Sequence, residues 1–249
     1  MSSLVLRALG VGAGLIVLWQ AIVIVFAPPP YLLPAPLAVL EALRDRPDLW
    51  RHHAVITLAE TVIGLVLGTV VGVVLALTMS FLPISRRLLL PVLVVSQAIP
   101  VFAIAPLLSL WFGFGITSKV VMATIAIFFP VTSAFADGLM RTDAGLLDLA
   151  RLYSARRWQV VGIIRIPGAL PDLVTGIRLA AVYAPVGALI GEWVGSTAGL
   201  GYAMVFANSR SETAVVFAAL FLVVAMSVAL RGLVDVATRR LTPWAPESR

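Results

Sequence analysis

Residues 54–79 read AVITLAETVIGLVLGTVVGVVLALTM, a run in which Glu60 is the one charged residue. A bilayer-crossing helix needs roughly 20 mostly apolar residues, so this run is long enough to span a membrane. Five further runs meet the same criterion: about 8–27, 88–112, 118–136, 173–194 and 213–234. None of the six shows the sustained alternation of a membrane β-strand. The sequence therefore predicts an all-α membrane protein with six transmembrane helices.

The composition of the whole chain favours the same class. Of its 249 residues, 61% are hydrophobic and 12% are charged, and the mean hydropathy is +1.05. Soluble domains carry about 25% charged residues, so this chain has too little charge to cover a soluble surface. The sequence contains no Cys and two His, which excludes a disulfide framework and a Cys nucleophile and leaves little for a zinc site.

The basic residues indicate which way the helices cross the membrane. Most of the 18 Lys and Arg residues fall at the termini and in the loops after the second and fourth runs. Lys and Arg concentrate on the cytoplasmic side of membrane proteins. We therefore expect both termini in the cytoplasm and Lys119 on the outer side. The net charge of +6 then reflects membrane topology and not nucleic-acid binding.

The segment 28–53 is expected on the outer side, between the first two spans. Its apolar Val39, Leu40 and Leu43 predict a short helix at the membrane surface. The adjacent His52 and His53 are interpreted as a solvated start of the next helix.

The third run, 88–112, is the least regular of the six. Pro91, Pro100 and Pro106 interrupt it, and Gln97 lies near its middle. Broken backbone survives in a membrane only where protein or a water-filled cavity satisfies the freed polar groups. We therefore expect this run to face the protein interior.

Glycine recurs at four-residue spacing on two of the predicted spans: Gly64, Gly68 and Gly72 on the second, and Gly187 and Gly191 on the fifth, continued by Gly195 and Gly199. Such bare faces allow close backbone approach between membrane helices. The spacing is compatible both with packing inside the chain and with a dimer seam.

The long cytoplasmic loop, about 138–172, has an amphipathic order of its own. Leu146, Leu149, Ala150 and Tyr153 fall on one face of a predicted helix. Thr142 or Asp143 is expected to cap its start, and Pro167 and Pro171 are expected to stop any helix before the fifth span. An apolar ridge of this kind fits either a groove in a partner protein or the lipid headgroups.

Residues 148–171 of this loop read DLARLYSARRWQVVGIIRIPGALP. The stretch resembles the loop of bacterial ABC importer permeases, whose pattern is Glu-Ala-Ala, three residues, Gly, nine residues, Ile, one residue, Leu-Pro. Every spacing is kept, while Asp148, Leu149, Ser154 and Ile166 replace Glu, Ala, Gly and Leu. Residues 33–43, 99–115, 128–143 and 192–204 are similar to the permease subfamily for nitrate, sulfonate, taurine and thiamine-precursor uptake.

The resemblance implies a type I ABC importer permease fold, a single transmembrane permease domain over 1–249, and a place in the bacterial inner membrane. It implies two permease copies, two cytoplasmic ATPase subunits and an external solute-binding protein. The chain has no phosphate-binding loop of the Gly-x-x-x-x-Gly-Lys type, so ATP and Mg are expected on the ATPase partner. The residues expected to contact that ATPase are Asp148, Leu149, Ala150, Arg151, Tyr153, Ser154, Ile164 and Pro167.

The translocation path is expected among polar or aromatic residues of the apolar spans: Ser96, Gln97, Glu60, Tyr183, Glu192 and Trp193. Glu60 and Glu192 fall near the outer ends of their spans, where water is expected to reach them. The resemblance favours a pyrimidine thiamine precursor of the hydroxymethylpyrimidine type as substrate. Alkanesulfonate, taurine, nitrate and riboflavin permeases are close neighbours.

Two functions of other classes remain as alternatives at this point. An ion-coupled secondary carrier needs an acid buried near the middle of the membrane and often has inverted repeats, and neither is evident in the sequence. A membrane enzyme acting on lipids needs a catalytic cluster at the interface, for which His52 and His53 with Asp48 are the sole candidates.

Overall fold

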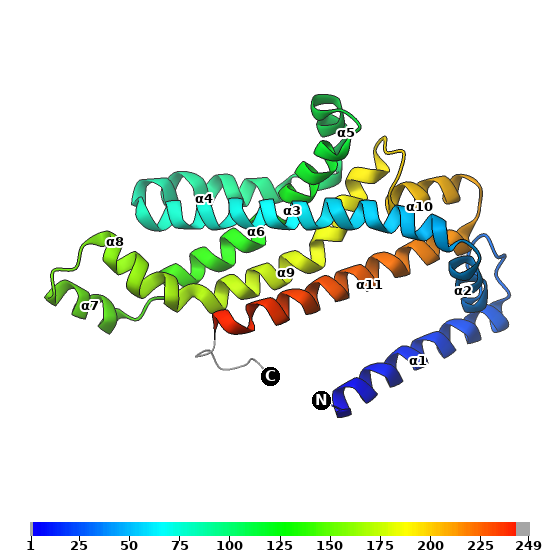
Figure 1. The fold of residues 1–249 in the computed structure, drawn as a ribbon, viewed down its shortest axis with the longest axis horizontal. Coiled ribbons are helices and arrows are strands. Elements are labelled where there is room, and N and C mark those ends of the chain that lie inside the picture. The colour runs from blue at the N-terminus through cyan, green and yellow to red at the C-terminus, as the bar shows by residue number, and fades with distance from the viewer. Residues whose placement is uncertain (1, 243–249) are drawn as a thin grey trace.

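The computed structural model describes residues 2–242, and all regular structure within them is helical (Figure 1). Among the described residues, four helices are long and apolar enough to cross a membrane: α3 (Pro47–Phe81), α6 (Ile116–Met140), the helix Arg157–Trp193 and α11 (Thr213–Thr238). Figure 1 shows these helices running along one another as an elongated bundle. The short helices α7 (Ala144–Leu152) and α8 (Arg157–Gln159) lie at one end, and α2 (Pro36–Asp45) and α10 (Leu200–Ser209) lie at the other.

Helix α1 (Ser2–Phe26) corresponds to the first predicted span. Its described apolar portion, Gly10–Phe26, is shorter than the four long helices, so the count of six spans stays a prediction. The Trp19 ring of α1 stacks on Phe217 and Phe221 of α11, with ring centroids 5.5 and 5.9 Å apart. The short helix predicted in the outer segment is α2, which buries Val39 against α11.

Helix α6 lies between α3 and α9 (Ile166–Trp193), and glycines on both neighbours make this close packing possible. A Cβ added at Gly72 of α3 would approach the Cβ of Val131 to 2.8 Å, and one at Gly187 of α9 would approach the Cα of Ala123 to 2.9 Å. Real Cβ atoms do not come so close. The glycine stripes of α3 and α9 therefore pack inside the chain, which answers the question that their spacing left open.

The third predicted run forms two helices, α4 (Pro83–Ala98) and α5 (Val101–Phe112), bent by 98°. The bend falls where Pro100 lacks the N–H that a continuous helix would need. The expectation that this run faces the interior is wrong for the single chain, because most large apolar side chains of α4 and α5 are exposed. Leu93 of α4 and Ala105 and Leu108 of α5 are the buried apolar exceptions.

The expectation that Pro167 and Pro171 stop the helix before the fifth span is also wrong. The chain is continuously helical from Arg157 to Trp193, through α8, a π-helical turn at Val160–Arg165 and α9. Within the π turn the N–H of Ile166 donates to the carbonyl of Val161. Pro167 follows in the first turn of α9, where a missing N–H is tolerated. The wider turn thus lets the helix pass the first proline unbroken.

Candidate functional site

Helix α7, in the loop that is predicted to be cytoplasmic, is the amphipathic helix that the sequence predicts. Of the two proposed caps the structure selects Asp143, whose Oδ1 accepts a hydrogen bond from the N–H of Leu146 at 3.1 Å. Thr142 instead donates its hydroxyl to the carbonyl of Leu139. A side-chain acceptor at this position satisfies one of the N–H groups that a helix start leaves open.

The end of α7 is a Schellman motif. The N–H of Ser154 donates to the carbonyl of Arg151, and the N–H of Ala155 donates to the carbonyl of Ala150, each at 2.9 Å. Ser154 has φ of 51°, the left-handed conformation that this motif requires and that glycine adopts most easily. Ser154 is also the residue that stands at the Gly position of the permease pattern, so the departure from the pattern is accommodated with strained backbone.

The ridge of α7 is exposed. The side chains of Leu149 and Tyr153 are 50% and 80% accessible, and Leu146 and Leu152 are also exposed. The placement of Ala150 on this exposed ridge is wrong, because its side chain faces the chain and is buried. An apolar ridge at this end of the bundle has no cover from the part of the chain that the structure describes.

The other predicted contact residues fall into two groups. Asp148 and Arg151 form an exposed ion pair of 2.6 Å beside the ridge. Ile164 lies in the π-helical turn and Pro167 in the first turn of α9, both half-buried and outside α7. Since α7 contacts the π-helical turn, the turn that contains Ile164 supports α7, and Pro167 continues the same helix beyond it.

At the opposite end of the bundle, the N-cap residue of α10 is Gly199. Glycine has no side chain that could accept a hydrogen bond, so α10 does not cap its own start. Its first three N–H groups are instead bound by side chains of α3 and α9. His53 Nδ1 accepts from the N–H of Gly199 at 3.0 Å, and Thr57 Oγ1 accepts from that of Leu200 at 2.8 Å. Glu192 Oε2 accepts from Gly201 at 2.5 Å. We call His53, Thr57 and Glu192 the α10 cap.

The α10 cap continues into a buried group of charged side chains. Thr57 donates its hydroxyl to Glu192 Oε1 at 2.5 Å, and the carboxyl groups of Glu192 and Glu60 lie against each other. Lys119 lies near both carboxyl groups and donates to the carbonyl of Phe114. Glu60 and Glu192 are 3% and 1% exposed, so the expectation that water reaches them is wrong.

The remaining candidates for the translocation path are placed differently. Gln97, Tyr183 and Trp193 are exposed, on α4 and on α9. Ser96 is half-buried and donates to the carbonyl of Leu93 in its own helix. The structure therefore buries Glu60 and Glu192 together, whereas none of the other four is buried.

Sequence reasoning missed three residues of this end of the bundle. The sequence predicts a solvated His53 and places Lys119 on the outer side, yet both are buried, and Thr57 is not among the residues that were predicted for a site. A signal was present in α3: His53, Thr57 and Glu60 occupy the same face as Gly64, at spacings of three and four residues. The polar residues extend the glycine stripe toward the helix start.

Comparison with known proteins identifies relatives of the chain over most of its length. A family model described as "Binding-protein-dependent transport system inner membrane component" matches residues 68–243. The chain is 44% identical to a "Probable ABC transporter permease protein" of Haemophilus influenzae, over 89% of this chain and 90% of that one. It is 35% identical to the "Formylaminopyrimidine transport permease protein ThiX" of Halalkalibacterium halodurans, over 86% of each.

Among solved structures, the fold is similar to a chain of the MetNI methionine ABC transporter in an inward-facing conformation. The TM-score is 0.69 at 20% sequence identity, covering 80% of this chain and 99% of that chain. At this identity the likeness concerns the fold alone.

Proposed function

This chain belongs to the family of binding-protein-dependent transport system inner membrane components, and we propose that it forms the translocation path for a pyrimidine precursor of thiamine. It is a permease subunit of an ABC importer and a multi-pass protein of the inner membrane. The substrate proposal is supported by the relative named for formylaminopyrimidine transport. It is supported too by residues 143–159 and 180–201, which resemble permeases for pyrimidine thiamine precursors.

In the proposed assembly two copies of the chain form the pore, each with six spans and both termini in the cytoplasm. Two cytoplasmic ATPase subunits bind ATP and Mg, and a solute-binding protein delivers the substrate from outside. Pairing of two permease copies is supported by α4 and α5, whose apolar side chains are largely uncovered by the described part of the chain. The orientation is supported by the concentration of Arg residues around α7 and α8.

The observation that carries the proposal is the exposed ridge of α7. Leu149 and Tyr153 present an apolar surface beside the exposed Asp148–Arg151 ion pair, as a helix does that docks into a groove of a partner. The Asp143 cap and the Schellman motif at Ser154 fix both ends of this helix before any partner binds. Closure of the ATPase pair on ATP would push on α7 and, through the support under it, on the long helix that begins at Arg157.

The coupling role is tested by purifying the tagged chain in mild detergent and measuring the ATPase subunit that remains bound. We expect Leu149→Arg to release the ATPase, because it places a charge in the apolar centre of the contact. Ala144→Arg is the matched control: it adds the same charge to an exposed position of the same helix, off the ridge. Equal retention in the two variants would refute the role of the ridge, and a chain that binds no ATPase at all would refute the importer assembly.

The substrate is tested by growth and uptake. Cells that cannot make the pyrimidine half of thiamine should grow on a low concentration of an external pyrimidine precursor only when the permease is present. Rescue of sulfonate-dependent growth and not of pyrimidine-dependent growth would overturn the substrate and favour the alkanesulfonate and taurine branch. Uptake should persist when the proton gradient is collapsed and ATP is maintained, whereas an ion-coupled carrier would stop.

A further inference from the structure

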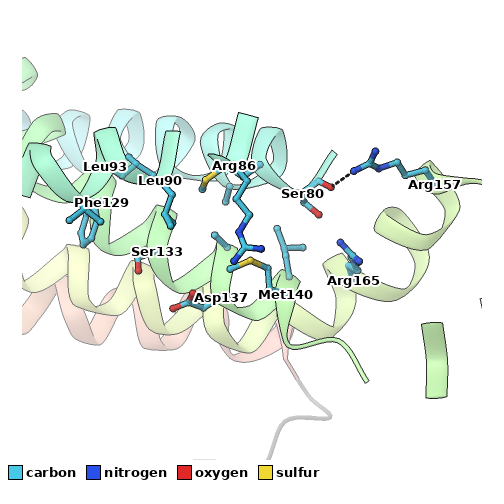
Figure 2. A pocket seen from close by; sticks show the side chains of 15 residues that line it. Ser80, Arg86, Leu90, Leu93, Phe129, Ser133, Asp137, Met140, Arg157 and Arg165 are labelled. Atoms are coloured by element: carbon cyan, nitrogen blue, oxygen red, sulfur yellow. Dashed lines mark hydrogen bonds between the residues drawn. The ribbon is translucent and has the colours of Figure 1, made fainter. Parts of the chain in front are cut away.

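A pocket of about 300 Å³ lies between the ends of α3, α4 and α6 and the segment from α8 to the start of α9 (Figure 2). It is at the same end of the bundle as α7 but takes no residue from the α7 ridge. Its volume is at the lower end of the range of small-molecule sites. None of the predicted coupling or translocation residues lines it.

The polar part of the pocket is strongly basic. Arg86 of α4, Arg157 of α8 and Arg165 of the π-helical turn line it, against the single carboxylate of Asp137. Figure 2 shows Arg86 reaching across the pocket toward α6, with Arg157 and Arg165 at its far side. Within residues 2–242, no acidic side chain comes within ion-pair distance of these three arginines.

Arg86 and Arg157 are exposed and Arg165 is half-buried, so the polar atoms that solvent does not reach belong to Arg165 and Ser80. Arg157 donates one hydrogen bond, to the backbone carbonyl of Ser80 at 3.3 Å. The Nε of Arg165 is buried, and the described residues offer it no acceptor. The hydroxyl of Ser80 is also buried and has no hydrogen-bond partner among the described residues. Burying such donors without acceptors is costly. A ligand with several acceptor oxygens and negative charge would satisfy them, and a phosphate group has both properties.

The opposite end of the pocket is mainly apolar, with the Ser133 side chain among the groups that line it. Leu90 and Leu93 of α4 and Phe129 of α6 line it, and Figure 2 shows them at the opposite end from Arg157 and Arg165. The basic end lies toward α7 and α8, and the apolar end lies farther along the spans. The pocket therefore has a basic end and a mainly apolar end, which match the charged head and the apolar tail of an amphiphilic ligand.

We propose that this pocket binds a phosphate-bearing amphiphile, with its phosphate among Arg86, Arg157 and Arg165 and its apolar part against Leu90, Leu93 and Phe129. Two sources carry this chemistry: an anionic phospholipid of the cytoplasmic leaflet and a soluble phosphate monoester with an apolar group. Basic pockets between spans on the cytoplasmic side hold anionic headgroups in other membrane proteins. None of the residues predicted for the translocation path or for the ATPase contact lines the site, so the proposal goes beyond the proposed transport function.

The test measures binding to the purified full-length chain in an uncharged detergent, without ATPase or transport substrate. The lipid source is represented by dioctanoyl phosphatidylglycerol and the soluble source by phenyl phosphate. Dioctanoyl phosphatidylcholine, which has the same tails but no net charge, and inorganic phosphate, which has no apolar part, are the matched controls. We expect one of the two amphiphilic anions to raise the unfolding temperature at concentrations at which neither control does, and the anion that acts identifies the source.

The variants locate the site. Arg86→Gln and Arg165→Gln should each weaken binding of the active anion by roughly tenfold, the effect of losing a charge-assisted hydrogen bond. Arg87→Gln removes the same charge one residue along α4, outside the pocket, and should leave binding unchanged. The proposal is overturned if neither amphiphilic anion acts, or if the active anion has no more effect than its own control, phosphatidylcholine for the lipid and inorganic phosphate for phenyl phosphate. Equal affinities of the Arg86 and Arg87 variants for the active anion would overturn it as well. Because no transport step is measured, failure here is distinct from failure of the importer function.

Discussion

Replacing Thr57 by valine tests whether the α10 cap holds together the end of the bundle at which α2 and α10 lie. The Thr57 side chain is fully buried, accepts a hydrogen bond from the N–H of Leu200 and donates one to Glu192. Valine has nearly the same shape, so it removes both hydrogen bonds and leaves the packing almost unchanged. The N–H of Leu200 and one oxygen of Glu192 then lose their partner in a place that water does not reach.

The expected cost follows from the two groups left behind. A buried donor or acceptor without a partner costs about 1–3 kcal/mol. Glu192 keeps the hydrogen bond from Gly201 through its other oxygen, which lowers the free-energy cost at Glu192. We therefore expect Thr57→Val to lower the free energy of unfolding by about 2–4 kcal/mol.

Thr61 supplies the matched control, one helical turn further along the same face of α3. Its side chain is also fully buried, and the described residues give its hydroxyl no hydrogen-bond partner. Thr61→Val therefore removes a polar group that is already unpaired. We expect it to be neutral or to stabilise the protein slightly.

The assay is reversible unfolding of the full-length chain in mixed micelles, together with hydrogen exchange of the amides at the start of α10. Thr57→Val should unfold at a lower denaturant concentration than Thr61→Val, and the amide of Leu200 should exchange faster in the Thr57 variant alone. If the two variants unfold together, or if exchange at Leu200 does not change, the cap does not anchor α10 and the reasoning is refuted.

Three further predictions concern other parts of the fold. Ser154→Gly should stabilise the end of α7 by about 1 kcal/mol, because glycine adopts the left-handed conformation without the steric cost that serine bears. Hydrogen exchange of the amides at the end of α7 should then slow roughly fivefold. Unchanged exchange would contradict the backbone strain at Ser154. Gly72→Leu should lower the unfolding temperature strongly, because a side chain at this position meets α6. Gly12→Leu, which has open space around it, should not lower it. Equal shifts of the unfolding temperature in the two variants would show that α3 and α6 are not in close contact. The chain lacks cysteine, so Ser209→Cys and Ala144→Cys each carry one thiol. In intact spheroplasts a membrane-impermeant maleimide should label the first and not the second, and the reverse pattern would overturn the orientation.

The features that sequence predicted well are local ones. The amphipathic helix α7, its capped start at Thr142 or Asp143 and the short helix α2 all depend on residues within one or two helical turns. The spacing of the permease pattern also places Ser154 at the helix end, where the structure has its left-handed residue. Local periodicity and capping determine these features, so a single sequence is sufficient to predict them.

The features that sequence missed depend on partners far along the chain. His53 was expected to be solvated because it stands at a helix start beside Arg51, yet its acceptor nitrogen binds the N–H of Gly199, 146 residues away. Lys119 is buried for the same reason, because its neighbours Glu60 and Glu192 come from two other helices. The helix boundary before α9 was misplaced because a proline rule for α-helices does not apply to a π-helical turn.

A polar side chain inside an apolar span has two uses, and the structure separates them. Irregular backbone within a membrane protein must find its hydrogen bonds inside the protein, and the turn between α9 and α10 finds them in His53, Thr57 and Glu192. The polar atoms of these side chains are already engaged in hydrogen bonds within the chain, so they offer few free hydrogen-bonding groups to a transported solute. Of the residues predicted for the translocation path, Gln97, Tyr183 and Trp193 are exposed and keep their polar groups available among the described residues. Substitutions at these three positions, and not at Glu192, are therefore expected to change transport without lowering the stability of the chain.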